Sequence, residues 1–437
     1  MQVDKTTLAD LSIFHAEEEQ SVFHYFNYTQ TNGGREYLRQ LMGNPLNSVA
    51  SILDTQLTIR QLMNVAKHWP ITITNGTIMV IERYYETQIN SFAKHPNTIN
   101  SHLYKLLNGP DYSLIRYTME HTIDFVKGFQ QIISLLGEQS LSKQLSLMAS
   151  RIGFLLNKPI IQEMLGAEKK KLSPEQILRY GGFIRYHFKN QSTELFEIYS
   201  KLDAYLSVAW VCNKYKFCFP EIVQSEEPFI KADGLYHPLL NAPVTCDIEL
   251  TVDKNFIFLT GANMAGKSTF IKAVGVSVYL AHLGMGIPGK KMQLSFFDGL
   301  LSNIQVVDNI SKGESFFFNE VQRIKSTIEK ISDGKKWLIL IDELFKGTNQ
   351  QDALKCSTTV IEGLRKMQNA LFILSTHLYE IGEDLRKYKN IQFHFFETTV
   401  TNDQLHFSYQ LKEGISNDRL GYLILRKEGV VDLLDKL

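Results

Sequence analysis

The 437-residue sequence has little cysteine, and its four cysteines form no C-x-x-C pair. Cys212, Cys218, Cys246 and Cys356 are scattered along the chain, which argues against a disulfide framework and against a cysteine-based zinc site. We therefore interpret them as reduced residues with a packing role.

Long apolar runs are also missing. No stretch reaches the roughly 20 apolar residues that a membrane-spanning helix needs, and residues 274–287 are too few and are interrupted by His282. The N-terminus has no basic start followed by an apolar run, so export is not indicated. We expect a cytoplasmic protein without a membrane partner.

Neither sign of charge is in excess, because 46 Lys+Arg stand against 46 Asp+Glu. The whole molecule therefore has no net field that attracts DNA, and a nucleic-acid contact would have to be local. One local basic cluster, in the first half of the chain, contains Lys169, Lys170, Lys171, Arg179, Arg185, His187 and Lys189, with Tyr180 and Tyr186 interleaved. It could contact phosphates, but Glu168 and Glu175 dilute it, which favours a solvated helix face.

The spacing of apolar residues along the sequence changes near residue 231. Up to that point apolar residues recur every three or four positions, which predicts helices, with breaks at 32–34, 44–45, 108–110 and 172–174, where Gly and Pro occur. From residue 232, short β-rich runs at 256–259, 337–341 and 371–374 alternate with helical patterns. The prediction is an all-α region over 1–231 followed by an α/β domain over 232–437.

The strongest local motif is the run Gly261-Ala262-Asn263-Met264-Ala265-Gly266-Lys267-Ser268, followed by Thr269. Its G-x-x-x-x-G-K-S spacing, between an expected strand and an expected helix, predicts a P-loop. The glycines let backbone N–H groups surround phosphate oxygens, Lys267 reaches the outer phosphates and Ser268 can hold Mg²⁺. A turn that merely joins strand to helix fits this context poorly.

Two further strands end in polar residues. The run WLILIDEL delivers Asp342 and Glu343 to the carboxyl end of a strand, where open α/β sheets bind ligands. Asp342 suits the Mg²⁺ shell and Glu343 suits the polarisation of an attacking water. The strand in LFILSTH ends near His377. A lone histidine usually packs, but this order is typical of ABC-type domains, in which the histidine senses the terminal phosphate.

These segments resemble the MutS mismatch-repair family. LTGANMAGKSTF looks like its P-loop, SKGESFFFNEVQRI its signature segment, LILIDELFKGTNQQDA its Asp-Glu strand with the dimer-facing loop, and STHLYEI its histidine switch. GLYHPLL and YQLKEGISNDRLGYLILRKEGV resemble the segments that open and close the same domain, and residues 29–62 look like the start of the helical core.

The resemblance implies an ATPase that binds ATP and Mg²⁺. It places Asn263 by the phosphates, and Ser315 on the terminal phosphate bound by the opposite subunit, so that two ATPs lie in a shared dimer interface. It places the ring of Tyr409 on adenine, with the loop before Asp247 over the other face.

The sequence also departs from the family pattern. The core pattern begins within the first thirty residues, so we expect no mismatch-reading domain ahead of it. The span from Pro45 to Pro238 is short for both the lever helices and the DNA clamp, and we expect no terminal dimerising helices before the last residue, Leu437. Ala262 stands where the family usually has proline, and Phe345-Lys346 replace Gly-Arg in the dimer-facing loop.

Our functional hypothesis is a MutS-like, DNA-responsive ATPase in mismatch repair or recombination. It would form an ATP-dependent homodimer, act on duplex or branched DNA and cooperate with a repair protein. The alternative is an ATP-driven switch that acts on a protein partner without binding DNA directly.

Overall fold

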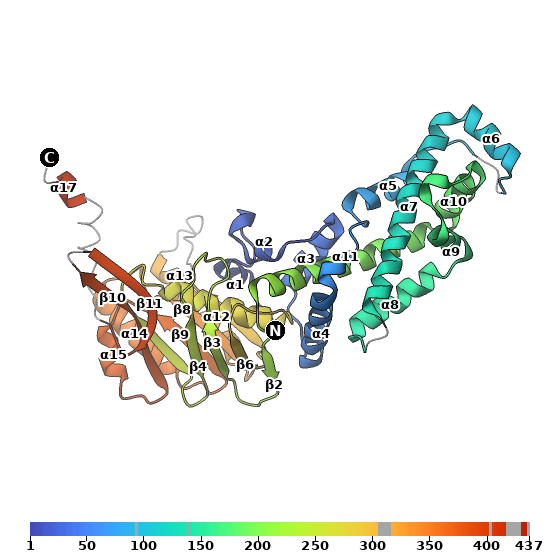
Figure 1. The fold of residues 1–437 in the computed structure, drawn as a ribbon. Coiled ribbons are helices and arrows are strands. Elements are labelled where there is room, and N and C mark those ends of the chain that lie inside the picture. The colour runs from blue at the N-terminus through green and yellow to red at the C-terminus, as the bar shows by residue number, and fades with distance from the viewer. Residues whose placement is uncertain (92–94, 138–139, 305–315, 402–403, 417–429, 435–437) are drawn as a thin grey trace. The chain divides into compact units, whose positions relative to one another are not determined.

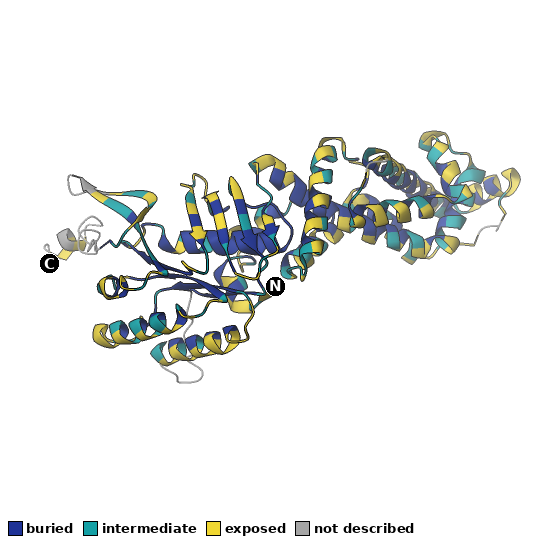
Figure 2. Cartoon of the chain, turned by 90° about the horizontal axis from the view of Figure 1, so that it is seen from below, coloured by how far each residue is buried: buried dark blue, intermediate teal, exposed yellow. Residues whose placement is uncertain are grey.

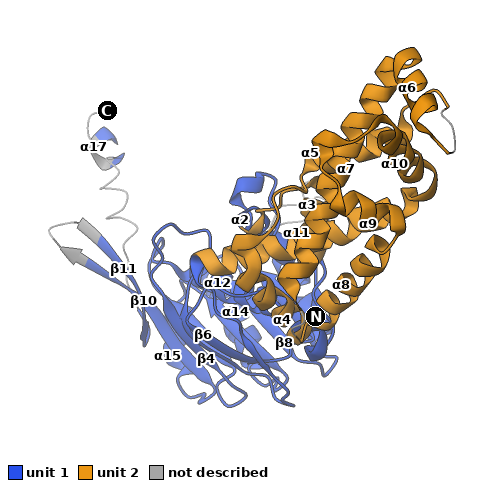
Figure 3. Cartoon of the chain, turned by 45° about the vertical axis from the view of Figure 1, so that its right-hand side comes forward, with its two compact units in different colours: residues 1–25, 44–52, 215–437 blue, residues 26–43, 53–214 orange. Residues whose placement is uncertain are grey.

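The computed structural model describes residues 1–437 except 92–94, 138–139, 305–315, 402–403, 417–429 and 435–437 (Figure 1). The chain forms two compact units (Figure 3). Unit 1 contains residues 1–25, 44–52 and 215–437, and unit 2 contains residues 26–43 and 53–214. Unit 1 is therefore assembled from three separate parts of the chain. The expected domain boundary between 231 and 232 stays a prediction.

Unit 2 is built from helices. Those with most of their length in it are α3 (Asn32–Gly43), α4 (Val49–Val65), α5 (Asn75–Glu86), α6 (Thr98–Leu107), α7 (Gly109–Leu136), α8 (Lys143–Leu156), α9 (Pro159–Gly166), α10 (Pro174–His187) and α11 (Lys189–Tyr215), with short 3₁₀ helices η2 (Ala66–His68) and η3 (Lys169–Lys171). The long α7 buries one face against α5, α8 and α10.

The predicted helix breaks at 44–45, 108–110 and 172–174 coincide with helix boundaries. The break predicted at 32–34 is misplaced, because these residues already form the first turn of α3 and the non-helical segment precedes them. The chain turns into α3 at Asn32 and leaves it at Gly43, ahead of Pro45. The break at 108–110 separates α6 from α7. Ser173 caps α10 by accepting a hydrogen bond from the Gln176 N–H, and Pro174 begins the helix, where its missing N–H has no effect.

A buried carboxylate fixes the approach to α3. Asp203, on α11, accepts hydrogen bonds from the backbone N–H groups of Gln30 and Thr31 and from the Thr31 hydroxyl. Burial raises the pKa of Asp203, and these hydrogen bonds oppose the rise. A Cβ on Gly34 would lie 2.1 Å from Asp203 Oδ2, so only glycine fits at this position. The glycine pattern at residues 33–34 thus has a packing cause.

Unit 1 contains a seven-stranded sheet and a four-stranded sheet. The first has the order β1 (Gln2–Val3), β7 (Gly299–Asn303), β8 (Trp337–Asp342), β9 (Ala370–Ser375), β5 (Phe256–Thr260), β10 (Ile391–Thr401) and β11 (Gln404–Glu413), and only the β10–β11 pair is antiparallel. The second has the order β2 (Glu221–Val223), β6 (Lys291–Ser295), β3 (Ile230–Leu235) and β4 (Cys246–Leu250).

Helices of unit 1 pack against both faces of the large sheet. The helices of this unit are α1 (Lys5–Asp10), η1 (Glu18–Gln20), α2 (Val22–Phe26, which ends in unit 2), α12 (Lys267–His282), α13 (Phe316–Ile331), α14 (Gln350–Leu364), α15 (Glu380–Leu385) and α17 (Val430–Leu434). Helix α12 contacts β8, β9 and β3 and is almost wholly buried (Figure 2). On the opposite face of the large sheet, alternate residues of β5, β8 and β9 form one apolar core with α13, α14 and α15.

The structure agrees with the predicted combination of a helix-rich region and an α/β domain with mixed sheets. The three expected strands are confirmed as β5, β8 and β9. The expectation that residues 1–231 are helical misses β1 and β2, which have two and three residues. Strands this short carry no alternation that a sequence pattern can reveal. Among the described residues, no helix has the length and apolarity needed to cross a membrane.

Gly275 lies where α12 packs most closely on the large sheet. A Cβ there would lie 2.6 Å from side-chain atoms of both Leu11 and Leu340. We predict that Gly275→Ala lowers the free energy of unfolding by about 1–3 kcal/mol, because the added methyl overpacks the layer. Gly363, on the exposed face of α14, would have nothing within 4 Å of an added Cβ and is the control. Gly363→Ala should stabilise by about 0.5–1 kcal/mol. Urea unfolding measures both, and equal effects would contradict the packing argument.

Candidate nucleotide site

The loop between β5 and α12 is the predicted P-loop. The five residues of β5 are all buried, and the chain leaves this strand at the carboxyl edge of the parallel sheet. Gly261 and Gly266 have φ values of 133° and 110°, and Met264 has 68°. The glycines adopt these left-handed conformations readily, which lets the loop turn back tightly before α12 begins at Lys267. This strand, loop and helix order is the one that the motif requires.

Lys267 is buried beneath this loop. Its Nζ donates hydrogen bonds to the carbonyl oxygens of Gly261 at 2.7 Å and Ala262 at 2.9 Å. Burial lowers the pKa of Lys267, while the nearby carboxylates of Glu343 and Asp342 oppose that shift. The ammonium group is therefore held inside the curve of the loop, where an anionic ligand would replace the two carbonyl contacts.

Asp342 joins three neighbouring elements at the carboxyl edge of the sheet. Its carboxylate accepts a hydrogen bond from Ser268 Oγ at 2.5 Å and a short one from Ser375 Oγ. Ser268 is on α12 and Ser375 ends β9, next to β8. A hydroxyl and a carboxylate so close together suit Mg²⁺, which usually takes one or two protein oxygens and fills its octahedron with phosphate and water. No group of three or more metal-binding side chains occurs among the described residues.

Glu343 follows at the end of β8 in a left-handed conformation, with φ of 63°. Its Oε1 lies 2.6 Å from Nε2 of His377, and its Oε2 lies 3.1 Å from Nζ of Lys346. Burial tends to raise the pKa of Glu343, but the hydrogen bonds and charges of His377 and Lys346 outweigh it and lower the pKa from 4.5 to about 2. The carboxylate is thus ionised at neutral pH. The contribution that the pairing of Glu343 with His377 and Lys346 makes to the stability of the folded state is present above pH 4.5 and is lost as pH falls toward 2.

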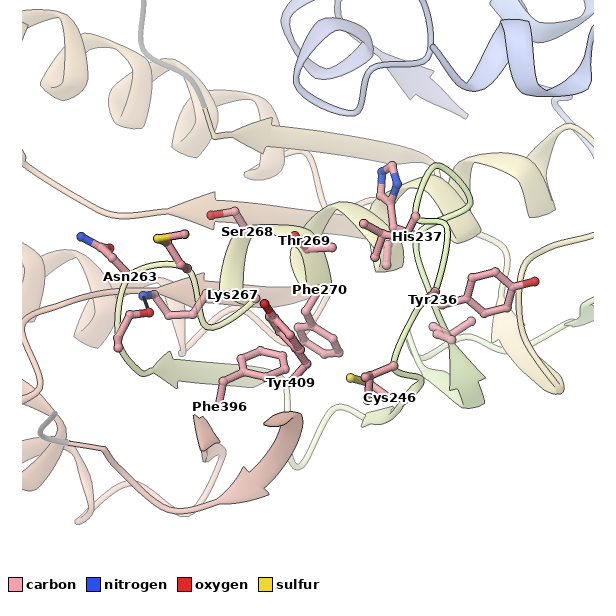
Figure 4. Close-up of a pocket in the computed structure, with 18 of the residues that line it drawn as sticks. Tyr236, His237, Cys246, Asn263, Lys267, Ser268, Thr269, Phe270, Phe396 and Tyr409 are labelled. Carbon is pink, nitrogen blue, oxygen red and sulfur yellow. Dashed lines mark hydrogen bonds between the residues drawn. The ribbon is translucent and has the colours of Figure 1, made fainter. Parts of the chain in front are cut away.

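A cavity of about 500 Å³ opens beside the loop (Figure 4). Its walls come from the P-loop and the start of α12, from Glu343, from the segment between β3 and β4, and from Phe396 and Tyr409. Figure 4 shows the rings of Phe396, Tyr409 and Phe270 gathered on one side of the cavity. Tyr409 lines the cavity and is 45% exposed.

The structure brings most of the predicted site residues together. The residues that line the cavity are Asn263, Met264, Gly266, Lys267, Ser268, Thr269, Glu343 and Tyr409. Gly261 and Ala265 belong to the same loop. Asp342 and His377 do not line the cavity themselves, but each contacts a residue that does: Asp342 contacts Ser268, and His377 contacts Glu343. Ser315 lies outside the described residues.

Sequence reasoning missed several members of the site. Lys346 was noted only as a departure from the family pattern, and Ser375 was given no role, although each contacts a predicted acidic residue. Nor was Phe396, which comes from β10, a strand with no motif of its own. His237, in the GLYHPLL segment, also lines the cavity, and burial lowers its pKa to about 4. The GLYHPLL segment indicated where the α/β domain begins, but nothing in its sequence indicated that His237 contacts the cavity.

The basic cluster of unit 2 is largely paired within that unit. Lys169 pairs with Asp124 at 2.5 Å, Lys171 pairs with Glu168 at 2.7 Å, Arg179 pairs with Glu163, and Arg185 donates to the carbonyl oxygens of Tyr84 and Thr87. Tyr180 is buried, while Tyr186 is 61% exposed. These contacts favour the solvated-face interpretation of the cluster.

Comparison with known proteins agrees with the geometry of unit 1. Residues 257–432 match the family model of MutS domain V. The DNA mismatch repair protein MutS of Petrotoga mobilis is 30% identical over 234 residues, which is 53% of this chain and 28% of that protein. MutS of Aquifex pyrophilus is 29% identical, covering 53% of this chain and 27% of that protein, and MutS of Staphylococcus haemolyticus is 29% identical, covering 62% and 31%. The match thus spans less than a third of the length of these relatives.

Proposed function

We propose that this MutS-like chain, which matches MutS domain V over residues 257–432, is an Mg²⁺-dependent ATPase. One observation carries the proposal: Lys267, the Ser268–Asp342 pair and Glu343 converge on one cavity at the carboxyl edge of the sheet. Side chains of these types in this arrangement suit phosphoryl transfer, which depends on positioning and charge stabilisation.

Each residue would have a distinct role. Lys267 would exchange its two carbonyl contacts for oxygens of the outer phosphates, while Ser268 and Asp342 would hold Mg²⁺, which supplies positive charge to the phosphates. Glu343 is ionised, and a carboxylate oxygen that accepts one hydrogen bond can accept another from the attacking water. His377, which is paired with Glu343 and 38% exposed, would respond to the terminal phosphate.

Binding of the base would use the aromatic side of the cavity. The loop 261–268 supplies backbone N–H groups to the phosphates, and the ring of Tyr409 can stack on adenine. The β3–β4 segment, which precedes Asp247, also lines the cavity, through residues that include Leu240 and Val244. This division between phosphate and base ends supports ATP as the ligand.

DNA is the proposed target of the ATPase cycle, and the distribution of charge supports contact through unit 2. Residues 26–43 and 53–214 contain 20 Lys+Arg and 14 Asp+Glu, a net charge of +6. Unit 1 contains the other 26 and 32, a net charge of −6. The neutral total therefore conceals a basic helical unit, which would attract duplex or branched DNA and act in repair or recombination with a repair protein partner.

A second candidate function is an ATP-driven switch that moves a protein partner without binding DNA. Helix α6 favours it, because Ile99, Leu103, Leu106 and Leu107 are each at least half exposed, while the buried side of the helix includes Ser101. Apolar side chains exposed in a group are typical of protein interaction surfaces. Direct measurement of DNA binding separates the two candidates.

We predict that Glu343→Gln retains ATP binding but slows steady-state hydrolysis by about 10²–10⁴-fold, because only the group that orients the water is lost. Lys267→Ala should instead abolish tight ATP binding in calorimetry, because the charge facing the phosphates is removed. Wild-type turnover in Glu343→Gln, or wild-type affinity in Lys267→Ala, would contradict the assignment of that residue.

We also propose that two copies share the ATP sites, with Ser315 of each copy directed to the ATP of the other. Dimerisation should then depend on ATP, since ligand bound at the interface stabilises the dimer by mass action. In sedimentation, Glu343→Gln should be a dimer with Mg²⁺-ATP and largely a monomer without it. Lys267→Ala is the matched control and should stay monomeric in both. A monomer in every condition would exclude the shared site.

DNA binding through unit 2 should be directed to the phosphate backbone and blind to mismatches. If the basic cluster contacts phosphates in spite of its internal ion pairs, neutralising Lys169, Lys170 and Lys171 together should weaken binding to all duplexes alike. The slope of log K against log salt should then fall by about 0.9 for each phosphate that the variant no longer neutralises. Neutralising the exposed Lys366, Lys387 and Lys389 of unit 1 is the control and should change nothing. Preferential displacement of homoduplex by mispaired DNA would refute this prediction, and no DNA binding at all would leave the protein-switch candidate.

A further inference from the structure

Glu320, in the first turns of α13, is a carboxylate buried to 5% exposure. Among the described residues its partners are the backbone N–H groups of Lys346, at 3.1 Å from Oε1, and Gly347, at 3.2 Å from Oε2. Burying a carboxylate is unfavourable unless donors meet its oxygens. Each oxygen has one such donor here, and both donors belong to a single short loop.

That loop holds Glu343 at its start. Glu343 and Phe345 have φ values of 63° and 58°, a region that residues with side chains rarely adopt. Such conformations persist only where the surrounding structure holds them, and they gather at functional sites. The contacts of the next two residues with Glu320 are therefore in the right place to maintain the turn that aims the Glu343 carboxylate.

Other contacts between α13 and this loop are apolar. The rings of Phe317 and Phe345 lie 5.7 Å apart. Gly347 sits directly on the start of the helix, where a Cβ would lie 2.7 Å from a ring atom of Phe316 and 2.8 Å from the Phe317 nitrogen. These contacts fix how near the loop lies to α13, but apolar contact is not directional. The hydrogen bonds to Glu320 are directional and set the orientation of the peptide groups.

We propose that Glu320 is a positioning residue for hydrolysis, which holds the loop 343–347 so that Glu343 points into the nucleotide cavity. The proposal rests on the function proposed above for Glu343. Glu320 itself is not among the residues that line the cavity, and its hydrogen bonds with described residues go to the backbone of Lys346 and Gly347. Its loss should thus leave ATP binding intact and slow the step that depends on Glu343.

The test compares kcat and KM for ATP in the full chain. Glu320→Ala should lower kcat by about tenfold to a hundredfold, as small misplacements of a reacting group do, with KM and the calorimetric ATP affinity within about twofold of wild type. Glu320→Gln keeps one acceptor oxygen, so its kcat should lie between that of Glu320→Ala and that of wild type. Glu329→Ala, on an exposed part of the same helix, is the matched control and should behave as wild type.

A double variant separates positioning from general destabilisation. If Glu320 acts through Glu343, adding Glu320→Ala to Glu343→Gln should reduce kcat no further, because the oriented group is already absent. A multiplicative loss in the double variant, or a kcat loss matched by an equal loss of ATP affinity, would overturn the proposal. If Glu320→Ala does not fold, Glu320→Gln and its double variant decide by the same criteria.

The outcomes also distinguish the positioning role proposed for Glu320 from the hydrolytic role proposed for Glu343. Wild-type turnover in Glu343→Gln would show that the role proposed for Glu343 is wrong. Slow turnover in Glu343→Gln together with normal turnover in both Glu320 variants would overturn the positioning role alone.

Discussion

The two hydrogen bonds to the Asp342 carboxylate are the constraint on which the site depends. Through them β8 is joined to Ser268 on α12 and to Ser375 on β9. Because Asp342 is buried, its charge must be met by donors, and the ends of these elements are held in one arrangement. The orientation of α12, and with it the loop that precedes α12, follows from this junction. So does the place where the chain turns sharply into Glu343.

The parts of the site that could be predicted are those encoded by neighbouring residues. The P-loop needs glycines, a lysine and a serine at fixed spacing, and β5, β8 and β9 are apolar runs that end in polar residues. What the sequence could not give was strand order. The contact between Glu343 and His377 exists because β8 and β9 are adjacent, and no local pattern encodes that adjacency.

Residues that act through backbone geometry were the least predictable. Lys346 follows an acidic pair in a polar loop, and its ion pair with Glu343 requires the left-handed turn at 343 and 345. Glu320 reads as one more charge on an amphipathic helix, yet it is buried by the loop that folds over it. The net charge of the whole chain was also uninformative, because equal numbers of basic and acidic residues are divided between a basic unit 2 and an acidic unit 1.

The division of unit 1 among three parts of the chain has a consequence for synthesis on the ribosome. Asp10 and Ser302 are buried and hydrogen-bonded to each other, Arg323 also pairs with Asp10, and 292 residues separate Asp10 from Ser302. At about 5–20 residues per second, its partners emerge roughly 15–60 s later. Unit 2 is translated completely during that interval and can fold first. The first strand and helix, with the apolar Leu11 and Ile13, meanwhile have no native surface to cover them. The segment around Asp10 therefore stays without its buried partner until after unit 2 has been translated.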